Sequence, residues 1–484
     1  MKRCLILAVV LLVTAVTATA GHPVLEAFGL PDTTPLGGLS ILRGRNELPP
    51  IDGVDVLARR DAAILARLAG DAPDILRKAG WFVVPLNDIP RSVGHKAIKT
   101  WTPVTVVNPD IQSMVDRIDW TTIIRTMSKV MRINSRYSTT DGCRAAADTL
   151  VAYFTRLGLA AQKDPFQVSG STAYNVVATK TGTVWPDSVF VICAHYDATS
   201  ESPLTYTPGA DDNASGTAAV MLAAQFLSEQ PSTCTVKFVC FAGEEQGLVG
   251  SNIWTAAQFA AGAEFAGALN FDMIGWWTDG VHRELEVEVD PASLWLGQAT
   301  INAAALYVPE MTCLLHIDAG AWWGDHASFW NYGYNAVNHE ESWDWGDPDF
   351  NPHYHSTDDE LLNLDVDFTV QNVKVAVAAI AMLAQPVSTT ATPLSLAGPR
   401  LFASPNPASG QVALRVDGMV DGASVRIQVV DLRGRIIAES STAAFGGVAT
   451  ASWRPDPAQH PAGIYMLRLP DHPGVNPVRV SVVR

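Results

Sequence analysis

The sequence predicts an α/β protein in which a largely parallel sheet is covered on both faces, followed by a small antiparallel β-sandwich. Three short apolar runs lie among helix-like segments without the alternation of a half-exposed strand, at 188–197, 235–245 and 267–275. Such runs are typical of parallel strands buried on both faces. Near the C-terminus the pattern changes to alternating runs divided by Gly, Pro and Asp, which is typical of a sandwich.

Length and composition indicate a folded chain of several domains. The 484 residues exceed what one hydrophobic core usually supports, so we expect two or three domains. Hydrophobic residues make up 48% of the chain and charged residues 17%, a balance that belongs to globular proteins and not to disordered ones.

Residues 1–20 have the three parts of an export signal peptide. Lys2 and Arg3 form the charged start, Leu5 to Val16 form a short apolar core, and Ala18-Thr19-Ala20 is a cleavage site of small residues. A membrane anchor is the alternative, but the apolar run is too short for a comfortable span. We therefore expect an exported protein with no membrane span after signal cleavage.

Residues 21–108 differ in composition from the rest of the chain and predict a small α+β pro-region or accessory domain. The stretch VDVLARRDAAILARLAG, residues 54–70, reads as a helix because it is rich in Ala, Leu and Arg. The stretch WFVVPL, residues 81–86, reads as a strand.

Residues 109–385 form the predicted α/β domain. A helix over residues 144–157 ends at Gly158, the three buried strands follow, and a helix over 370–384 closes the region. A Pro/Ser/Thr linker at 386–400 leads to the sandwich, residues 401–484, whose strand-like runs include 412–416, 424–431 and 463–469.

Charge and cysteine content exclude two kinds of site. The net charge is −16, and removal of the signal peptide with its two cations makes it −18, so nucleic acid is not an expected partner. No C-x-x-C pair occurs, so a zinc–thiolate site is not expected. Cys193, Cys234 and Cys240 lie in strand-like runs, where we expect buried free thiols.

Acids and histidines stand where the predicted strands end. The positions are His195 and Asp197, Asp211 and Asp212, Glu244 and Glu245, Asp272, and His355. In an open α/β sheet, ligands bind beyond the carboxyl ends of the strands, so we expect these groups to converge on one rim. Carboxylates and imidazoles without thiolates suit zinc or a similar divalent ion.

The number of donors suggests two ions that share one aspartate. Two ions about 3.5–4 Å apart can hold an attacking water and a carbonyl together. A further carboxylate that is not a ligand would take the proton of the water and pass it to the leaving amine. The adjacent Glu244 and Glu245 could divide the two roles of base and ligand.

The motifs AHYD, PGADDNASG, FAGEEQGLVGS, NFDMIG, GDHASF and NPHYHSTDDE together resemble the co-catalytic di-zinc exopeptidases, a family that includes bacterial leucyl aminopeptidases and glutamate carboxypeptidase. The resemblance covers roughly residues 110–385, with the motifs in the order of the family. It implies a phosphorylase/hydrolase-like fold with a mixed central sheet flanked by helices, and two Zn²⁺ as cofactors.

The resemblance also implies a role for each site residue. His195, Asp212 and Asp272 would hold one zinc, and Asp212, Glu245 and His355 the other, so that Asp212 bridges the two ions. Asp212 and not Asp211 matches the bridge because it stands three residues before the Ser215-Gly216 pair.

The remaining catalytic roles come from the same motifs. Glu244 matches the general base, and Asp197 matches an acid that orients His195, as metal-bound histidines usually require. Asp359 is a similar candidate, and either of these two acids could instead be a turn residue. A cis peptide is implied between Asp212 and Asn213.

Other nearby residues stay outside the predicted ligand set. His326, His339 and His353 are not assigned as ligands, and His326 is given a structural or substrate-facing role. A tryptophan group either lines a specificity pocket or packs in the core: Trp322, Trp323, Trp343 and Trp345. Glu340 or Glu341 could contact the free amine of a substrate.

The C-terminal motifs SPNP, DLRGR and AGIY resemble the sorting or flagellar-hook-capping-like sandwich of exported bacterial proteins. This resemblance implies passage to the outer surface or secretion, with the secretion machinery as a partner and with possible removal of the domain. A generic sandwich that serves as a spacer or binding module is the alternative.

The sequence therefore predicts a secreted zinc aminopeptidase that acts on peptides. Three alternatives remain: a glutaminyl cyclase of the same fold with one zinc, a carboxypeptidase that would need arginines near the site, and a non-catalytic binding protein. Residues 195–360 contain a single arginine, Arg283, and the predicted ligand set is complete, which favours the aminopeptidase.

Overall fold

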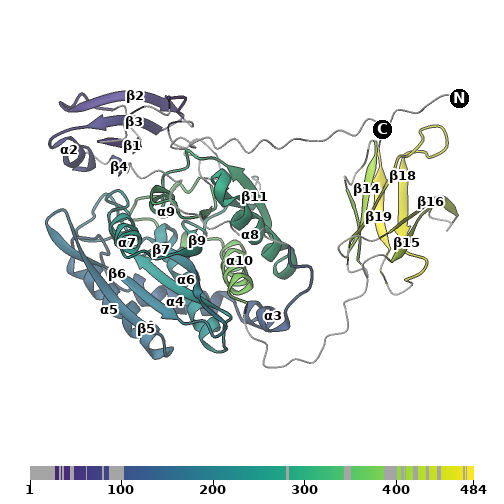
Figure 1. The fold of residues 1–484 in the computed structure, drawn as a ribbon, viewed down its shortest axis with the longest axis horizontal. Coiled ribbons are helices and arrows are strands. Elements are labelled where there is room, and N and C mark those ends of the chain that lie inside the picture. The colour runs from purple at the N-terminus through teal and green to yellow at the C-terminus, as the bar shows by residue number, and fades with distance from the viewer. Residues whose placement is uncertain are drawn as a thin grey trace, which may run out of the picture. The chain divides into compact units, whose positions relative to one another are not determined.

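The computed structural model describes the chain in two compact units, and Figure 1 shows their elements. The described residues are parts of 25–86, then 103–278, 283–342 and 350–385, and most of 400–483. The predicted signal peptide, almost all of the predicted linker, Trp343 and Trp345 lie outside them. One unit contains an N-terminal sheet and a large central sheet, and the other contains the C-terminal sandwich.

The N-terminal sheet has four antiparallel strands in the order β2-β3-β1-β4. Its elements are β1 (Leu39–Arg43), β2 (Val54–Arg60), β3 (Ala63–Leu68), α2 (Ala72–Lys78) and β4 (Phe82–Pro85). The predicted strand at 81–86 is confirmed. The predicted helix over 54–70 is wrong, because Val54–Arg60 and Ala63–Leu68 form two antiparallel strands, β2 and β3. Pairing of β3 with strands on both sides and burial of Leu65 in the core shared with the large domain outweigh the helix propensity of Ala, Leu and Arg.

One face of the N-terminal sheet shares a hydrophobic core with the large domain. Leu39, Ile41 and Val84 of this sheet lie in the same cluster as Leu248 and Phe329. The other face, with Leu42 and Ile64, packs with Leu76 of α2. The N-terminal sheet is therefore built into the unit that carries the large sheet.

The large sheet has eight strands in the order β11-β10-β12-β9-β7-β8-β6-β5. These strands are β5 (Ala160–Val168), β6 (Ser171–Lys180), β7 (Trp185–His195), β8 (Cys234–Phe241), β9 (Phe265–Phe271), β10 (Glu284–Val289), β11 (Thr312–Ile317) and β12 (Ala336–Glu340). The predicted strands are β7, β8 and β9, and they lie side by side and parallel. β5, β6 and β8 pair antiparallel, as do β10 and β12, so the sheet is mixed.

Helices cover the large sheet, and several are almost wholly apolar. They are α3 (Pro109–Asp116), α4 (Trp120–Met131), α5 (Asp141–Arg156), α6 (Gly216–Ser228), α7 (Val249–Ala260), α8 (Leu294–Tyr307), α9 (His326–Asn331) and α10 (Val366–Ala384). The two predicted helices are confirmed as α5 and α10. The α6 and α8 helices each pack against α10, whereas α7 and α9 pack together beside the N-terminal sheet.

Helix α10 alone among the described helices is long and apolar enough to cross a membrane. However, 72% of its apolar window is buried inside the unit, where it contacts α6 and α8. Burial of this kind is typical of the central helix of a folded core.

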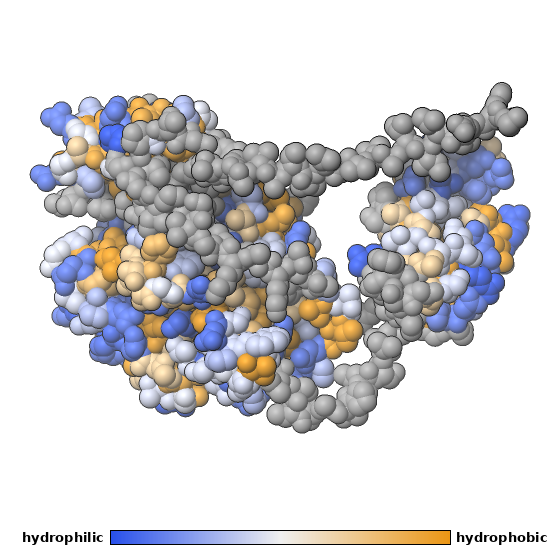
Figure 2. Space-filling view, in the orientation of Figure 1, coloured by the Kyte–Doolittle hydropathy of each residue, from blue (hydrophilic) through white to orange (hydrophobic). Residues whose placement is uncertain are grey.

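The C-terminal unit is a sandwich of two antiparallel sheets, as predicted. Its strands are β13 (Arg400–Ser404), β14 (Val412–Asp417), β15 (Ser424–Asp431), β16 (Ile436–Ala443), β17 (Val448–Trp453), β18 (Gly463–Arg468) and β19 (Val478–Val482). The sheets have the orders β13-β14-β17 and β16-β15-β18-β19. Alternate side chains such as Val425, Ile427 and Val429 point into one apolar core. Figure 2 shows hydrophilic residues along the side of the sandwich where β16 lies.

Candidate metal centre

The predicted donors lie at the carboxyl ends of the three parallel strands. His195 is the last residue of β7, Glu244 and Glu245 follow β8, and Asp272 follows β9 directly. Asp212 lies in the segment Ala210–Ser215, which leads into α6, and its backbone is not helical, with a φ of −102° and a ψ of 89°. Because parallel strands end at the same edge of a sheet, these segments meet there.

Asp212 lies between the two histidines of the site. Its Oδ1 is 3.2 Å from His195 Nε2, and its Oδ2 is 3.2 Å from His355 Nε2. Each carboxylate oxygen thus faces a different imidazole nitrogen. This is the arrangement that a carboxylate shared by two cations requires.

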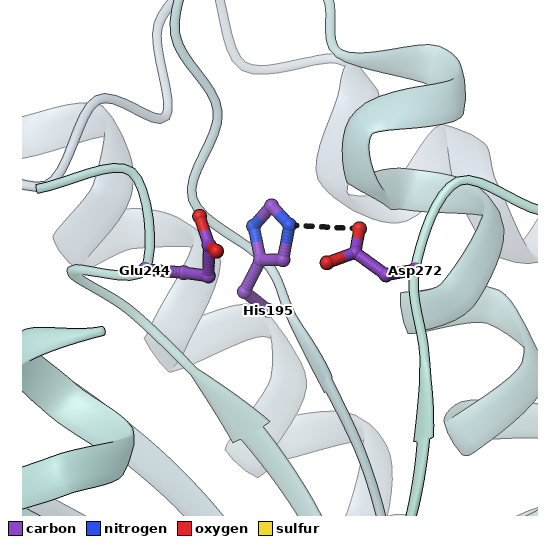
Figure 3. A group of neighbouring side chains, drawn as sticks. All are labelled: His195, Glu244 and Asp272. Atoms are coloured by element: carbon purple, nitrogen blue, oxygen red, sulfur yellow. Dashed lines mark hydrogen bonds and ion pairs between the residues drawn. The ribbon is translucent and has the colours of Figure 1, made fainter. Parts of the chain in front are cut away.

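The first group of donors surrounds His195. Its Nε2 lies 3.1 Å from Asp272 Oδ1, and Glu244 approaches the ring from another loop (Figure 3). One donor atom of each of these three residues lies within 4.8 Å of the others, a spacing that could hold a metal ion. His195, Asp212 and Glu245 form a second such group.

The second group of donors surrounds His355. Its Nε2 lies 2.9 Å from Glu245 Oε2 as well as 3.2 Å from Asp212. The ring of Tyr354 stacks on the ring of His355, with centroids 3.7 Å apart. His355 is only partly buried, whereas the side chains of Asp212 and Glu245 are almost fully buried. The site therefore opens to solvent on the side of His355.

The buried carboxylates create a demand for positive charge. Burial would lower the pKa of His195, but the carboxylates of Asp272, Glu244, Asp197 and Asp212 raise it well above its ordinary value. For His355, burial opposes the carboxylates of Glu245 and Asp212, which raise its pKa to about 9. Burial raises the pKa of Glu245 to about 7 and that of Glu244 well above its ordinary value. Without a cation, the site would have to hold protons instead.

These residues fit a pair of zinc ions by their chemistry. The donors are imidazole nitrogens and carboxylate oxygens, which zinc binds, and no thiol takes part. The Oε1 atom of Glu245 is buried and lacks a hydrogen-bond partner. A buried carboxylate oxygen without a partner is costly, and a bound cation would remove that cost.

The two predicted supporting acids contact the site in different ways. His195 Nδ1 lies 3.1 Å from the backbone carbonyl of Asp197 and 3.6 Å from its Oδ1, so the main chain makes the closer contact. Asp197 Oδ2 accepts hydrogen bonds from Ser138 and from the Gly243 amide. Asp359 does not contact His355 in the bonds described; its carboxylate accepts from the amides of Asp211 and Asp212.

The Asp211 carboxylate is hydrogen-bonded to two other segments of the chain. It accepts from the Gly275 amide at 2.8 Å and from Asn351 Nδ2 at 2.7 Å. Burial raises the pKa of Asp211 to about 6, while the hydrogen bonds from Asn351 and Gly275 act to lower it. Asp211 thus joins the segments that carry Asp212, Asp272 and His355.

The acids considered for the substrate amine have other partners. Glu341 accepts from the Trp276 amide, and Glu340 accepts from Trp323 Nε1. His326 is buried and bonds to the Ala321 carbonyl, in agreement with a structural role. Trp322 is also buried and packs in the core shared with the N-terminal sheet.

Sequence reasoning missed the segment 134–140, which connects α4 to α5. Arg136 and Ser138 of this segment are fully buried and bond to the loops that carry His195, Asp212 and Glu244. The run SRYSTT has no periodicity or motif that the chemistry of the site demands. An arginine and small polar residues between two helices were the only available signal.

Backbone conformation is unusual around the donors. Met273 and His355 have φ angles of 50° and 56°, in the left-handed region that few residues other than glycine adopt. Leu248, three residues after Glu245, has a φ of 57°. The Asp212–Asn213 peptide is cis, as the resemblance implies. Unfavourable φ angles of this kind cluster at functional sites.

Comparison with known families agrees with this geometry. Residues 175–380 match peptidase family M28, and residues 403–479 match the secretion system C-terminal sorting domain. The second match confirms the predicted sorting domain and supports export or display at a bacterial cell surface.

Two proteins of similar sequence are named as peptidases. A probable zinc metalloprotease of Leptosphaeria maculans is 28% identical over 285 residues, which cover 48% of this chain and 65% of that protein. The chain therefore spans a little less than two thirds of this relative. A probable leucine aminopeptidase of Trichophyton verrucosum is 28% identical over 318 residues, which cover 62% of this chain and 78% of that protein.

Solved structures share the fold. The LapA aminopeptidase of Legionella pneumophila has a TM-score of 0.56 at 20% identity and covers 72% of this chain and 99% of its own. LapB of the same organism has a TM-score of 0.55 at 18% identity and covers 69% of this chain and 95% of its own. At such identities the likeness shows the mixed α/β fold.

The family match confirms the resemblance drawn from the motifs, and with it the predicted peptidase chemistry and the zinc cofactor. The match to a peptidase family and the groups of donors that could hold metal both favour an enzyme over a non-catalytic binding protein. Residues 175–380, which carry the five donors, match the model of peptidase family M28.

Proposed function

We propose that this chain is an exported aminopeptidase that removes N-terminal residues from peptides with two zinc ions. The observation that carries the proposal is the position of Asp212, whose two carboxylate oxygens each lie 3.2 Å from a different histidine nitrogen. A single-metal site would not need one carboxylate to face two separate histidines.

The remaining donors divide around Asp212. His195 and Asp272, 3.1 Å apart, would complete one zinc site. His355 and Glu245, 2.9 Å apart, would complete the other. Zinc bound there would polarise the scissile carbonyl and lower the pKa of water toward 7.

Glu244 is the residue that we propose to move the proton. It is buried, lies beside His195 and Asp272, and comes from the same turn as Glu245. Burial, together with the negative charges of Asp272, Glu245 and Asp325, raises its pKa, although the positive charge of His195 opposes them. A carboxylate with a raised pKa can accept a proton from water and then donate it to the leaving amine.

The charges around the site favour a substrate with a free amino terminus. A carboxypeptidase would need a cation for the C-terminal carboxylate. Between residues 195 and 360 the chain has two such cations, Lys237 within β8 and Arg283, and Arg283 binds Asp365 at 2.6 Å. Arg136 is fully buried and donates to backbone carbonyls. The excess of acids would instead attract a protonated α-amine.

The two-site donor set also separates this proposal from a glutaminyl cyclase, which would use one zinc.

For the route of export, we propose that residues 1–20 direct the chain out of the cytoplasm. The sorting domain would then carry it through the type IX machinery to the outer surface or the medium, with possible removal of that domain.

A substrate panel tests the proposed activity. The purified chain would be assayed with aminoacyl substrates, the same substrates with a blocked amine, and N-terminal glutaminyl peptides, each with and without a chelator. We expect cleavage of unblocked substrates only, abolished by the chelator, with two zinc ions per chain by elemental analysis. Equal cleavage of blocked peptides, or cyclisation with one zinc per chain, would overturn the proposal.

A further inference from the structure

One buried segment outside the predicted donor set joins the loops of the metal centre. The segment is 134–140, between α4 and α5. Ser138 Oγ donates to Asp197 Oδ2 at 2.7 Å and accepts from the Gly243 amide at 2.7 Å. The amide of Thr207 donates to the Asn134 carbonyl, and the Arg136 amide donates to Thr207 Oγ1. These bonds reach the loop after β7, the loop before Asp212 and the loop that begins at Gly243.

Arg136 makes the most of these contacts. Its Nε donates to the Tyr196 carbonyl, its Nη1 to the Pro208 carbonyl and its Nη2 to the Gly209 carbonyl, each at 2.8 Å. Tyr196 directly follows His195, and Gly209 is three residues before Asp212. One planar guanidinium therefore connects the backbone next to His195 with the backbone next to Asp212.

The Arg136 side chain is tightly packed against the two loops that it connects. Arg136 is 0% exposed. A Cβ atom on Gly209 would lie 2.8 Å from Arg136 Nη2 and 2.5 Å from Ala198 Cβ, so the two loops and the guanidinium are in tight contact. Gly209 has a φ of 48°, a conformation that glycine adopts without strain.

Negatively charged side chains of the site act on the positive charge of Arg136. Burial lowers its pKa, and the negative charges of Asp359, Asp197 and Asp212 act in the opposite sense. Arginine stays protonated even when buried. The guanidinium thus adds a fixed cation behind the acids, while its hydrogen bonds go to carbonyls and leave the carboxylates of the site free for metal.

We propose that Arg136 is a positioning residue that fixes the separation of His195 and Asp212, and so sets the affinity and ligand geometry of the two zinc sites. The inference rests on the metal centre of the proposed function. A lysine could supply the charge but not the planar fork, because one ammonium cannot face three carbonyls with the same geometry.

Metal binding tests this proposal without any substrate. Arg136→Met and Arg136→Lys would be compared with wild type by zinc titration of the metal-free protein against a chromogenic chelator. The visible absorption spectrum of each cobalt-substituted protein would report the ligand geometry. We expect zinc affinity to fall by about 10–100-fold in both variants, as is usual when groups that orient metal ligands are lost. The cobalt spectrum should change in both.

Two control variants separate positioning from general loss of stability. Arg117→Met removes a surface arginine that pairs with Glu229. Glu229 follows the C-terminal end of α6, whereas Asp212 precedes the N-terminal end of the same helix. Leu150→Ala removes packing from the buried face of α5 and lowers stability away from the donors. We expect both controls to keep the wild-type zinc affinity and cobalt spectrum. Hydrogen exchange over residues 196–212 should rise in the Arg136 variants alone, which would show loosening of these loops in a protein that still folds.

Specific outcomes would overturn the inference. Wild-type zinc affinity in Arg136→Met would refute it, and full rescue by Arg136→Lys would show that charge alone matters. Equal loss of zinc in Leu150→Ala would show a general stability effect. A wild-type protein that binds two ions but cleaves no peptide would refute the proposed activity and leave the Arg136 result to stand by itself.

Discussion

The domain that carries the metal centre and the C-terminal sandwich differ in the kinds of side chain that they bury. Among the described residues of the sandwich, Gln428 is the one buried polar side chain, and the rest of the core is apolar. The peptidase domain buries acids and histidines at the edge of its sheet, among them His195, Asp211, Asp212 and Glu244. Like charges in a low-dielectric interior are unfavourable unless a cation or shared protons offset them.

The difference shows that the residues of the two domains meet different requirements. The sandwich follows binary patterning, in which alternation places apolar residues inside. The peptidase domain departs from such rules at the donors, with left-handed backbone at Met273 and His355 and a fully buried Arg136. Departures of this kind are expected where function, and not stability, selects the residues. Changes at the donors should therefore alter metal binding and activity, whereas changes in the sandwich should alter neither.

The largest expected effect comes from the shared carboxylate. Asp212→Ala should lose both zinc ions and reduce activity to background, because both histidines lose their common partner. Asp211→Ala should be milder, with a loss of about 10–100-fold, because Asp211 orients the surrounding segments and does not face the histidines. Zinc content and kcat/KM check this ranking. A more damaging Asp211→Ala would show that the bridge is assigned to the wrong aspartate.

A smaller loss is expected at the proposed base. Glu244→Gln keeps the shape of the side chain and removes its ability to accept a proton. We expect two zinc ions to remain while kcat falls by about 10²–10⁴-fold, with little change in KM. Steady-state kinetics and elemental analysis of the same sample provide the measurement. Undiminished turnover in this variant would remove Glu244 from the mechanism.

The strand-end acids could be anticipated because their placement depends on local sequence and one general rule. His195, Glu244 and Asp272 each end a short apolar run, and parallel strands end at a common edge. The same reasoning recovers β7, β8, β9 and the long apolar helix α10. Asp212 needed the resemblance to the family, because local pattern does not distinguish it from Asp211.

The remaining features depend on contacts between distant segments. Arg136 meets the Pro208 and Gly209 carbonyls, 72 and 73 residues away, and no periodicity encodes such a contact. Residues 54–70 favour a helix locally, yet β3 pairs on both sides and buries Leu65 against the large domain. Tertiary pairing outweighs local propensity here, since the two states differ little in intrinsic preference.

Acid should destabilise the peptidase domain through a buried histidine that has no counterpart in the sandwich core. His339 lies between the Asn270 carbonyl and Thr300 Oγ1, and burial lowers its pKa to about 4. The unfolded state binds a proton near pH 6.5, whereas the folded state resists it until about pH 4. The unfolded chain thus holds more protons in this window, so stability falls as pH falls from 6.5 to 4. The expected loss is on the order of 3 kcal/mol.

The variant His339→Gln isolates this contribution from zinc release. Urea unfolding of metal-free wild type and variant would be measured at several pH values between 7.5 and 4.5. We expect the stability advantage of wild type to shrink as pH falls, while any separate transition of the sandwich stays the same in both proteins. A constant difference across the range would contradict the role of His339.

The smallest effect is expected from the sandwich itself. Its core, which includes Leu414, Ile427 and Leu467, is built from residues 401–482 alone. Leu467→Ala should lower the free energy of unfolding of the sandwich by about 2–5 kcal/mol. Neither this variant nor a chain that ends at residue 385 should change zinc content, and kcat/KM should stay within about twofold of wild type, since no donor depends on that core. Calorimetry beside the aminoacyl assay checks both statements. If the shortened chain lost zinc or activity, the sandwich would have to support the metal centre, and the contrast between the two interiors would no longer separate stability from function.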